Sequence, residues 1–290
     1  MNEFHQKVNA FYQTAKRAKR VVAEFFLTHP EEAAFMTLDE IAARTGVSPA
    51  TITRTATEIG FKGYPDLQEE IRKSVRRSLA PVERLETKTL PEGSLGYRES
   101  IAIDQQNLSA LASLNDDASI EKAIELLSTA PQVHLTGSRS SYSPVSFLGF
   151  MLAQIRPRVR VITENEGRIP EQVLDVEQGD LLLAIALPRY AKTVVDTMKE
   201  AKNRGCQIIS VSDSSTSPLS QLSDISLFVP YESYSFFNST VSALALFNAL
   251  VTGVNVRLGA SALKRLQEHG ALMEQRELLL RTSSRFSEKK

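Results

Sequence analysis

Residues 46–64, GVSPATITRTATEIGFKGY, predict a short helix with a sharply defined start and end. Ser48 can cap the helix N-terminus, and Pro49 suits the first helical position because its missing N–H is not needed there. Gly60 stands where a helix ends in a left-handed residue. The apolar residues between these ends recur at helical spacing and form one face: Ile52, Ala56 and Ile59.

The opposite face of this helix carries short hydroxyls beside a guanidinium, at Thr51, Arg54 and Thr55. An arginine can donate to guanine O6 and N7, and a threonine can contact a thymine methyl group or a phosphate. We therefore expect the N-cap Ser48, with Thr51, Arg54 and Thr55, to lie near bases in the major groove of double-stranded DNA.

A second capped helix is predicted directly before this one, over residues 37–44. Thr37 is a candidate N-cap, and Glu40 follows at the spacing of a capping box. The link Thr45-Gly46-Val47 is short and contains the glycine that a tight corner between two helices favours. The two helices fit a helix-turn-helix, and an ordinary helical hairpin in a bundle remains the alternative.

Basic residues accompany the helices on both sides of this motif. Residues 4–28 are expected to form one supporting helix, with Lys16, Arg17, Lys19 and Arg20 on its outer side. A further helix starts at Tyr64. Its outer face and the turn before it hold the side chains expected at DNA phosphates: Lys62, Arg72 and Lys73, with Arg76 and Arg77 beyond them. The other reading of these charges is a solvated helix surface.

Composition limits the class of protein. The chain has 290 residues, 42% apolar and 23% charged, as in ordinary soluble globular proteins with room for two domains. A formal net charge of +0 means that any contact with DNA depends on a local patch. Cys206 is the only cysteine, which excludes an internal disulfide and a Cys-rich metal site; we expect no metal and no cofactor. We find no signal peptide and no run of about 18 apolar residues, and so expect a cytoplasmic protein without a membrane span.

The pattern of apolar residues changes after a linker at residues 81–98, which contains Pro81, Pro91, Gly93 and Gly96. Helices are expected at 99–114 and 117–129, and short apolar strands then alternate with helices. The predicted strands are 132–136, 158–162, 180–186, 207–211 and 225–229; the predicted helices are 142–155, 192–204, 238–258 and 259–280. This alternation predicts an α/β domain with a doubly wound, five-stranded parallel sheet. We expect a helix-turn-helix DNA-binding domain at 1–80, an effector-binding domain at 99–283 and a tail at 284–290.

Three loops that leave predicted strands carry polar side chains: 136–141, 187–193 and 212–218. Ligands of open parallel sheets bind at the carboxyl ends of the strands, and a helix N-terminus with hydroxyls favours an anion. Taken singly, each loop fits an N-capping turn; together they predict a small-molecule site. The expected site residues are Gly137, Ser138, Arg139, Ser140, Ser141, Arg189, Tyr190, Asp213 and Ser214, with Glu232 as a contact to ligand hydroxyls.

Residues 47–54 and 59–67 resemble the helix-turn-helix of RpiR-type bacterial transcription regulators, and the alternating region resembles their sugar isomerase (SIS) domain. The resemblance covers nearly the whole chain. It implies a dimer or tetramer on operator DNA and a flavodoxin-like domain that senses a metabolite, often a phosphosugar. Ser141 matches a serine that holds phosphate in SIS domains. Residues 186–191, ALPRYA, replace the usual Ser-x-Ser-Gly-x-Thr, so Arg189 would grip phosphate or carboxylate in place of hydroxyl donors.

The leading hypothesis is a transcription regulator, not an enzyme, whose SIS domain senses a phosphosugar or a related sugar acid. The alternative is a phosphosugar isomerase with an appended helical domain, which needs a positioned base. Glu164, Glu166, Glu232 and His269 are the candidates for that base, whereas His134 lies in mid-strand and is expected to be a core imidazole. A third possibility is a metabolite-binding protein whose helical domain contacts another protein.

Overall fold

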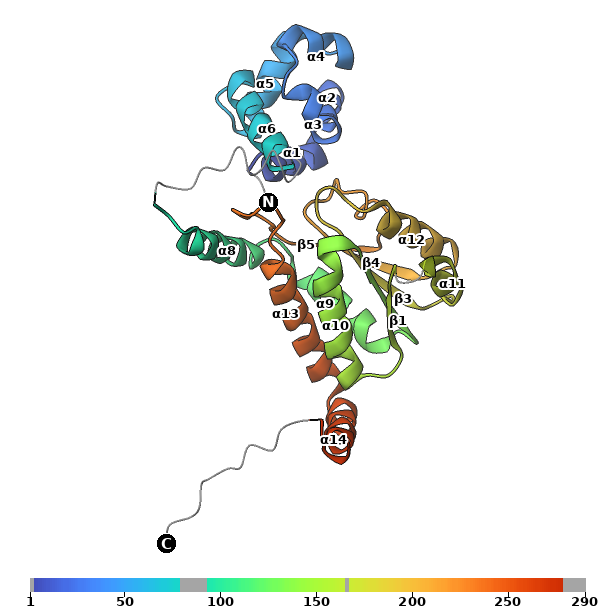
Figure 1. The fold of residues 1–290 in the computed structure, drawn as a ribbon. Helices are drawn as coiled ribbons and strands as arrows, with labels where there is room; N and C mark the ends of the chain where they lie inside the picture. The colour runs from blue at the N-terminus through green and yellow to red at the C-terminus, as the bar shows by residue number, and fades with distance from the viewer. Residues whose placement is uncertain (1–2, 79–92, 165–166, 279–290) are drawn as a thin grey trace.

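The computed structural model describes residues 3–78, 93–164 and 167–278 of the chain. Most of the expected linker, residues 81–92, and the expected tail at 284–290 lie outside these ranges. The domain boundaries drawn from the sequence therefore remain predictions. The two parts of the chain that the sequence distinguishes, one all-helical and one α/β, are both present (Figure 1).

The N-terminal part consists of short helices around one small core. They are α1 (Glu3–Thr14), α2 (Ala18–Thr28), α3 (Pro30–Ala33), α4 (Leu38–Thr45), α5 (Pro49–Ile59) and α6 (Tyr64–Ser78). Phe26, Ile41, Ile52 and Leu67 are fully buried in this core. The single helix expected over residues 4–28 is wrong, because the chain breaks at Arg17, whose φ of 51° is left-handed and cannot continue a helix.

The predicted caps of the helix-turn-helix are confirmed. Thr37 and Glu40 form the capping box at the start of α4, and the Ser48 side chain accepts a hydrogen bond from the main-chain N–H of Thr51 at the start of α5. Gly46 and Gly60 end the two helices with φ values of 69° and 105°, in the region that favours glycine.

The C-terminal part is a five-stranded, all-parallel sheet covered by helices, as predicted. Its elements follow two helices, α8 (Tyr97–Leu111) and α9 (Asp117–Thr129). They are β1 (Val133–Gly137), a 3₁₀ turn at Arg139–Ser141, α10 (Tyr142–Ile155), β2 (Val159–Ile162), α11 (Ile169–Leu174), β3 (Leu181–Ile185), α12 (Lys192–Asn203), β4 (Gln207–Ser212), β5 (Ile225–Phe228), α13 (Val241–Leu258) and α14 (Ala260–Gln275). The strand order is β2-β1-β3-β4-β5, and Val133 of β1 pairs with Val159 of β2 and Leu181 of β3.

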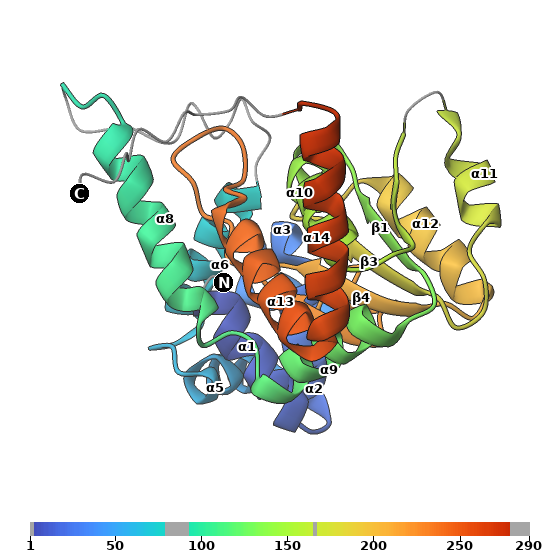
Figure 2. The same ribbon diagram turned by 90° about the horizontal axis from the view of Figure 1, so that it is seen from below.

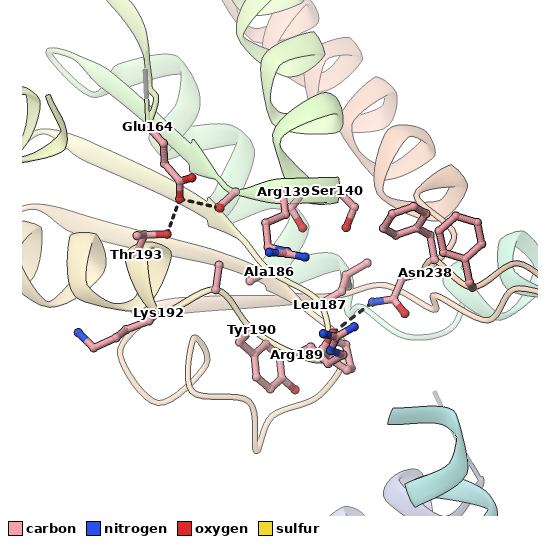
Figure 3. A pocket seen from close by; sticks show the side chains of 16 residues that line it. Arg139, Ser140, Glu164, Ala186, Leu187, Arg189, Tyr190, Lys192, Thr193 and Asn238 are labelled. Atoms are coloured by element: carbon pink, nitrogen blue, oxygen red, sulfur yellow. Dashed lines mark hydrogen bonds between the residues drawn. The ribbon is translucent and has the colours of Figure 1, made fainter. Parts of the chain in front are cut away.

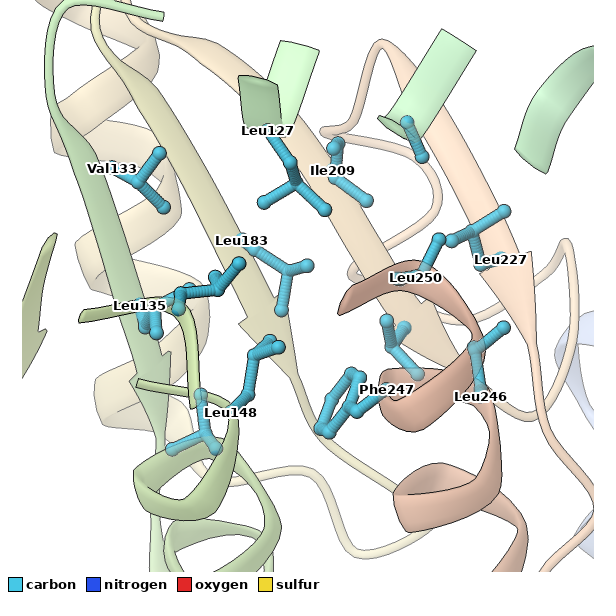
Figure 4. Close-up of a cluster of buried hydrophobic side chains, with 14 of the residues drawn as sticks. Leu127, Val133, Leu135, Leu148, Leu183, Ile209, Leu227, Leu246, Phe247 and Leu250 are labelled. Atoms are coloured by element: carbon cyan, nitrogen blue, oxygen red, sulfur yellow. The ribbon is translucent and has the colours of Figure 1, made fainter. Parts of the chain in front are cut away.

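Residues of β3 alternate between two hydrophobic layers, one on each face of the sheet. Leu181, Leu183 and Ile185 belong to the layer under α9, α10 and α13, whereas Leu182 and Ala184 belong to the layer under α11 and α12. Figure 2 shows these two groups of helices on opposite sides of the strands. In the first layer, Phe247 of α13 packs beside Leu183 and Leu148 (Figure 4).

Helix α13 is long and apolar enough, at 18 residues, to cross a membrane by length and composition alone. Its sequence is not an unbroken apolar run, since it includes Ser242, Asn248, Thr252, Asn255 and Arg257. Moreover, Ala243, Leu246, Phe247, Leu250 and Val254 of α13 are all buried in the layer against the sheet. This helix is a core element of the domain, and its composition reflects that position.

We predict that Phe247→Ala destabilises the α/β part by about 3–5 kcal/mol, because a fully buried ring is replaced by a cavity in the layer that joins α13 to the sheet. The midpoint of urea unfolding, followed by circular dichroism on the full chain, measures the effect. Phe35→Ala makes the same chemical change at a ring that is 77% exposed, and should leave the midpoint almost unchanged. Equal effects of the two substitutions would contradict the assignment of Phe247 to the core.

Candidate functional site

The exposed surface of α5 differs in part from the predicted one. Arg54 is exposed, and its Nε donates to the Ala50 carbonyl at 3.3 Å. Thr51 is half-buried, with Oγ1 2.9 Å from the exposed Ser48 hydroxyl. Thr55 is fully buried, and its hydroxyl donates to the Thr51 carbonyl at 2.8 Å. The prediction that Thr55 faces the DNA groove is therefore wrong, because at 100° per residue it turns toward the same core as Ile52 and Ile59.

Sequence reasoning missed two other residues on the open side of α5. Thr57 is exposed and Thr53 is half-buried, and both lie within one turn of Arg54. Their hydroxyls donate to carbonyls four residues earlier, at 3.1 Å in each case. Helical spacing identifies both positions, because residues one before and three after Arg54 lie close to its side of the helix. The exposed residues of α5 are thus Ala50, Arg54, Thr57 and Glu58, with Ser48 before them and the half-buried Thr51 and Thr53 between them; Glu58 is paired with Lys19 at 2.7 Å.

The residues expected at DNA phosphates divide into different groups. Lys62 has an exposed side chain, and its main-chain N–H is held by Asp66 Oδ2 at 2.9 Å. Arg72 has a different role from the one predicted: its Nε donates to the Ala34 carbonyl at 2.8 Å and its Nη2 to Gln68 Oε1 at 3.3 Å. The guanidinium thereby ties α6 to the end of α3. The side chains of Lys73, Arg76 and Arg77 lie outside what the structure describes.

A cavity of about 420 Å³ opens at the carboxyl ends of β1, β2 and β3. The order of the strands reverses between β1 and β3, and this switch point is where open parallel sheets bind ligands. The polar and aromatic lining consists of Ser138, Arg139, Ser140, Ser141, Glu164, Arg189, Tyr190, Lys192, Thr193, Phe236, Phe237 and Asn238 (Figure 3). The first two predicted loops therefore meet in one pocket.

The remaining predicted site residues do not line this pocket. Gly137 supports the turn, since a Cβ there would lie 2.6 Å from the Ser141 carbonyl oxygen. Ser214 is buried beside Thr216, and the Glu232 carbonyl accepts from Asn107 Nδ2 at 2.7 Å. Asp213 lies outside the lining, hydrogen-bonded to the lining residue Tyr190. The third loop follows β4, which is on the far side of β3 from the switch point, and so the expectation that all three loops share one site was too broad.

Two arginines give the pocket its positive charge. Arg139 follows β1 and Arg189 follows β3, and both have left-handed backbones, with φ values of 55° and 70°. Such a conformation is uncommon outside glycine and tends to occur at functional sites. Within the parts of the chain that the structure describes, neither guanidinium forms a hydrogen bond or ion pair. Both groups are therefore open to a bound anion.

The loop that carries Arg189 is anchored through its neighbour. The Tyr190 hydroxyl donates to Asp213 Oδ1 at 2.7 Å, and the Ser212 hydroxyl donates to the same oxygen at 3.1 Å. Burial, together with the Asp213 charge, raises the pKa of Tyr190, so the phenol remains a donor. The predicted residues Tyr190 and Asp213 thus do come together, with the aspartate acting as an anchor for the pocket wall.

Glu164 contributes a carboxylate at the other side of the pocket. Its Oε1 accepts from Thr193 Oγ1 at 2.6 Å and from Ser138 Oγ at 2.7 Å (Figure 3). The hydrogen bond from Thr193, then that from Ser138, and the nearby Arg139 charge lower the pKa of Glu164. The group is therefore an anion at neutral pH. Sequence reasoning included Glu164 only as a candidate base.

The segment between β5 and α13 forms a further side of the pocket, which no sequence pattern predicted. Phe236 and Phe237 have ring centroids 4.3 Å apart and are 41% and 50% exposed. Next to them, Asn238 Nδ2 donates to the Pro188 carbonyl at 3.3 Å, which ties this segment to the loop after β3. Two adjacent, exposed aromatic rings at a pocket offer an apolar surface for a ligand.

Among the other candidates for an isomerase base, none is placed in the pocket by the described residues. Glu166 lies outside them, and Glu232 and His269 do not line the cavity. His134 is fully buried, with Nε2 2.9 Å from Asp180 Oδ2, as expected for a core imidazole. Glu164 is thus the single predicted base that the described pocket contains.

We predict that Arg72→Ala destabilises the helical part by about 1–2 kcal/mol, because the half-exposed guanidinium donates to a main-chain carbonyl of another helix. Thermal unfolding of the full chain measures the change. Arg44→Ala is the matched control: Arg44 pairs with Glu32 at 3.8 Å, and both side chains are about half exposed. If the two variants melted at the same temperature, the structural role of Arg72 would be wrong.

Comparison with known proteins identifies both parts of the chain. Residues 2–78 match the model of the rpiR-family helix-turn-helix domain, and residues 126–253 match that of the SIS domain. The regulator HexR of Pseudomonas aeruginosa is 24% identical over 282 residues, covering 92% of this chain and 95% of HexR.

Solved structures show the same fold. The sugar isomerase domain of an RpiR transcription factor from Sphaerobacter thermophilus has a TM-score of 0.58 and 26% identity, covering 60% of this chain and 98% of that one. NanR of Vibrio vulnificus, complexed with ManNAc-6P, has a TM-score of 0.58 and 22% identity, covering 94% and 98%. The chain belongs to the RpiR-type family of helix-turn-helix transcription regulators with a C-terminal SIS domain.

Proposed function

We propose that this regulator binds an anionic sugar derivative, a sugar phosphate or a sugar acid, in the pocket at the β1/β3 switch point, and that binding alters its affinity for operator DNA. The observation that carries the proposal is the pair Arg139 and Arg189. Both line the pocket, both have left-handed backbones, and neither guanidinium is engaged by the described part of the protein.

The shape and chemistry of the pocket support the same class of ligand. A cavity of about 420 Å³ accommodates a compound of monosaccharide size. Ser140 and Ser141 add hydroxyl donors beside Arg139, and Phe236 and Phe237 offer an apolar surface to a sugar face. NanR, a protein of the same fold, is complexed with the phosphosugar ManNAc-6P, which makes that compound a suitable first probe.

The coupling between ligand and DNA follows from linkage. We infer a homodimer or homotetramer, as the family resemblance implies, with one recognition helix α5 for each operator half-site, spaced by about one helical turn of DNA or a multiple of it. A ligand that favours one arrangement of the subunits changes operator affinity by about 5–150-fold when the coupling is about 1–3 kcal/mol. The relatives' names as regulators favour this reading over isomerase catalysis.

For DNA binding, we predict that Arg54→Ala weakens specific binding by about 5–150-fold, the effect of losing one good base contact of about 1–3 kcal/mol. Lys62→Ala should weaken binding to all sequences equally and reduce the salt slope by about one. Fluorescence anisotropy with a DNA sequence selected from a random library by the full chain measures both. Arg98→Ala, on α8, is the control. Unchanged affinity in Arg54→Ala would reject α5 as the recognition helix.

For the ligand, we predict that ManNAc-6P, glucose 6-phosphate or gluconate raises the melting temperature of the full chain, and that Arg189→Ala abolishes the shift. A ligand at 100 times its dissociation constant stabilises a protein by about 2.7 kcal/mol.

Arg158→Ala is the matched control for that experiment. Arg158 has the same left-handed backbone, with a φ of 56°, but precedes β2 at the opposite edge of the sheet. A shift that depends on Ser141 and Arg189 together indicates a phosphate, whereas a shift confined to gluconate indicates a carboxylate. A shift that survives Arg189→Ala in every case would overturn the proposed site.

A further inference from the structure

The lining of the pocket carries side chains of both charges, and Arg139 lies close enough to Glu164 to lower the pKa of its carboxyl. Arg139 and Arg189 make one part cationic, and the ammonium group of Lys192 is paired with Asp196. Glu164 makes the other part anionic. Figure 3 shows Glu164 and Thr193 at one end of the pocket, Asn238 at the other, and Arg139 between them. A ligand that fills the cavity therefore meets a carboxylate as well as guanidinium groups.

The hydroxyls nearest to Glu164 are already used. Each hydroxyl has one proton to donate, and both Ser138 and Thr193 donate theirs to Oε1 of Glu164, at 2.7 and 2.6 Å. An incoming oxyanion at this end would meet hydroxyl lone pairs and a charged carboxylate. Among the described residues no group donates to the second oxygen, Oε2, so this atom is open to a donor on the ligand.

The carboxylate is also held where a negative charge is stabilised. Thr193 is the second residue of α12, a helix of 12 residues, and the N-cap Ala191 has no side chain that can cap the helix. A carboxylate near the first turn of a helix interacts favourably with the helix dipole. The hydrogen bond from Thr193 thus holds a carboxylate of the protein itself beside the first turn of α12.

From this geometry we infer that Glu164 determines specificity by admitting a ligand with one acidic group only. The acidic group binds at Arg139 and Arg189, and a hydroxyl or ammonium group of the ligand donates to Glu164. Compounds with acidic groups at both ends, such as sugar bisphosphates, are rejected. This inference rests on the proposed anion site and names the class of compound that the site selects.

The test compares three probes on the full chain by isothermal titration calorimetry: glucose 6-phosphate, glucosamine 6-phosphate and glucose 1,6-bisphosphate. The wild type should bind the two monophosphates at least tenfold more tightly than the bisphosphate. Glu164→Gln removes the charge and keeps the size of the side chain, and should reduce this preference by about tenfold. It should also remove any advantage of glucosamine 6-phosphate over glucose 6-phosphate, because the ammonium group loses its carboxylate partner.

Three further variants separate charge from geometry. Glu164→Asp keeps the charge and should keep the preference for monophosphates. Thr193→Val removes one hydroxyl but leaves the carboxylate, and should also keep the preference. Glu171→Gln removes an exposed carboxylate from α11, outside the pocket lining, and is the matched control for net charge. If Glu164→Gln does not fold, Glu164→Ala removes the charge in its place, and Thr193→Val remains the comparison that keeps it.

The outcomes distinguish the two proposals. If wild-type binding of the monophosphates depends on Arg189 but the preference over the bisphosphate is unchanged in Glu164→Gln, the role of Glu164 is wrong and the anion site stands. If Glu164→Gln raises the affinity for all three probes by the same factor, the carboxylate only competes with the ligand as an anion, and the inference is overturned. If none of the probes binds the wild type or Glu164→Gln, or if Arg189→Ala leaves the affinities unchanged, the proposal of the anion site is wrong.

Discussion

The reversal of strand order between β1 and β3 is the constraint on which the rest of the α/β domain depends. A parallel sheet must be covered on both faces, and here the connections leave β1 and β3 toward opposite faces. The loops after these strands therefore separate, and a cavity forms between them. The fully buried β3 holds this edge in place, since Leu181–Ile185 supplies residues to both hydrophobic layers. The position of the pocket is thus a property of the fold, and its chemistry is a property of the loops.

In these loops, the residues with strained backbones are the same arginines that give the pocket its positive charge. A non-glycine residue in a sparsely populated backbone region costs about 1–3 kcal/mol, and the pocket holds two, Arg139 and Arg189. Such a conformation persists only when the surroundings enforce it. For Arg189 the enforcing contacts are visible on both sides: Tyr190 is bonded to Asp213, and the Pro188 carbonyl accepts from Asn238. The strained residue is held between two anchors.

Local rules predicted the features that depend on neighbouring residues. The caps at Thr37 and Ser48, the glycine ends at Gly46 and Gly60 and the order of strands and helices each follow from a few adjacent positions. The errors concern contacts that are distant in sequence. Arg72 is tied to the carbonyl of Ala34, 38 residues earlier, and a pattern of charges cannot show that partner. Likewise, Phe236–Asn238 reaches the pocket because the chain after β5 returns across the sheet edge, which helical and strand periodicity do not encode.

The bond between Tyr190 and Asp213 has a consequence for how this pocket can change during evolution. The two residues belong to different loops, yet the phenol of the half-buried Tyr190 donates to the carboxylate of the buried Asp213. Loss of Asp213 leaves the phenol without this acceptor, and loss of Tyr190 leaves the carboxylate with the hydrogen bond from Ser212 alone, whereas a joint replacement by two apolar residues avoids the cost of an unpaired polar group. The two loops are therefore expected to diverge as a linked pair, and new ligand specificities arise most readily at the positions between them that carry no such bond.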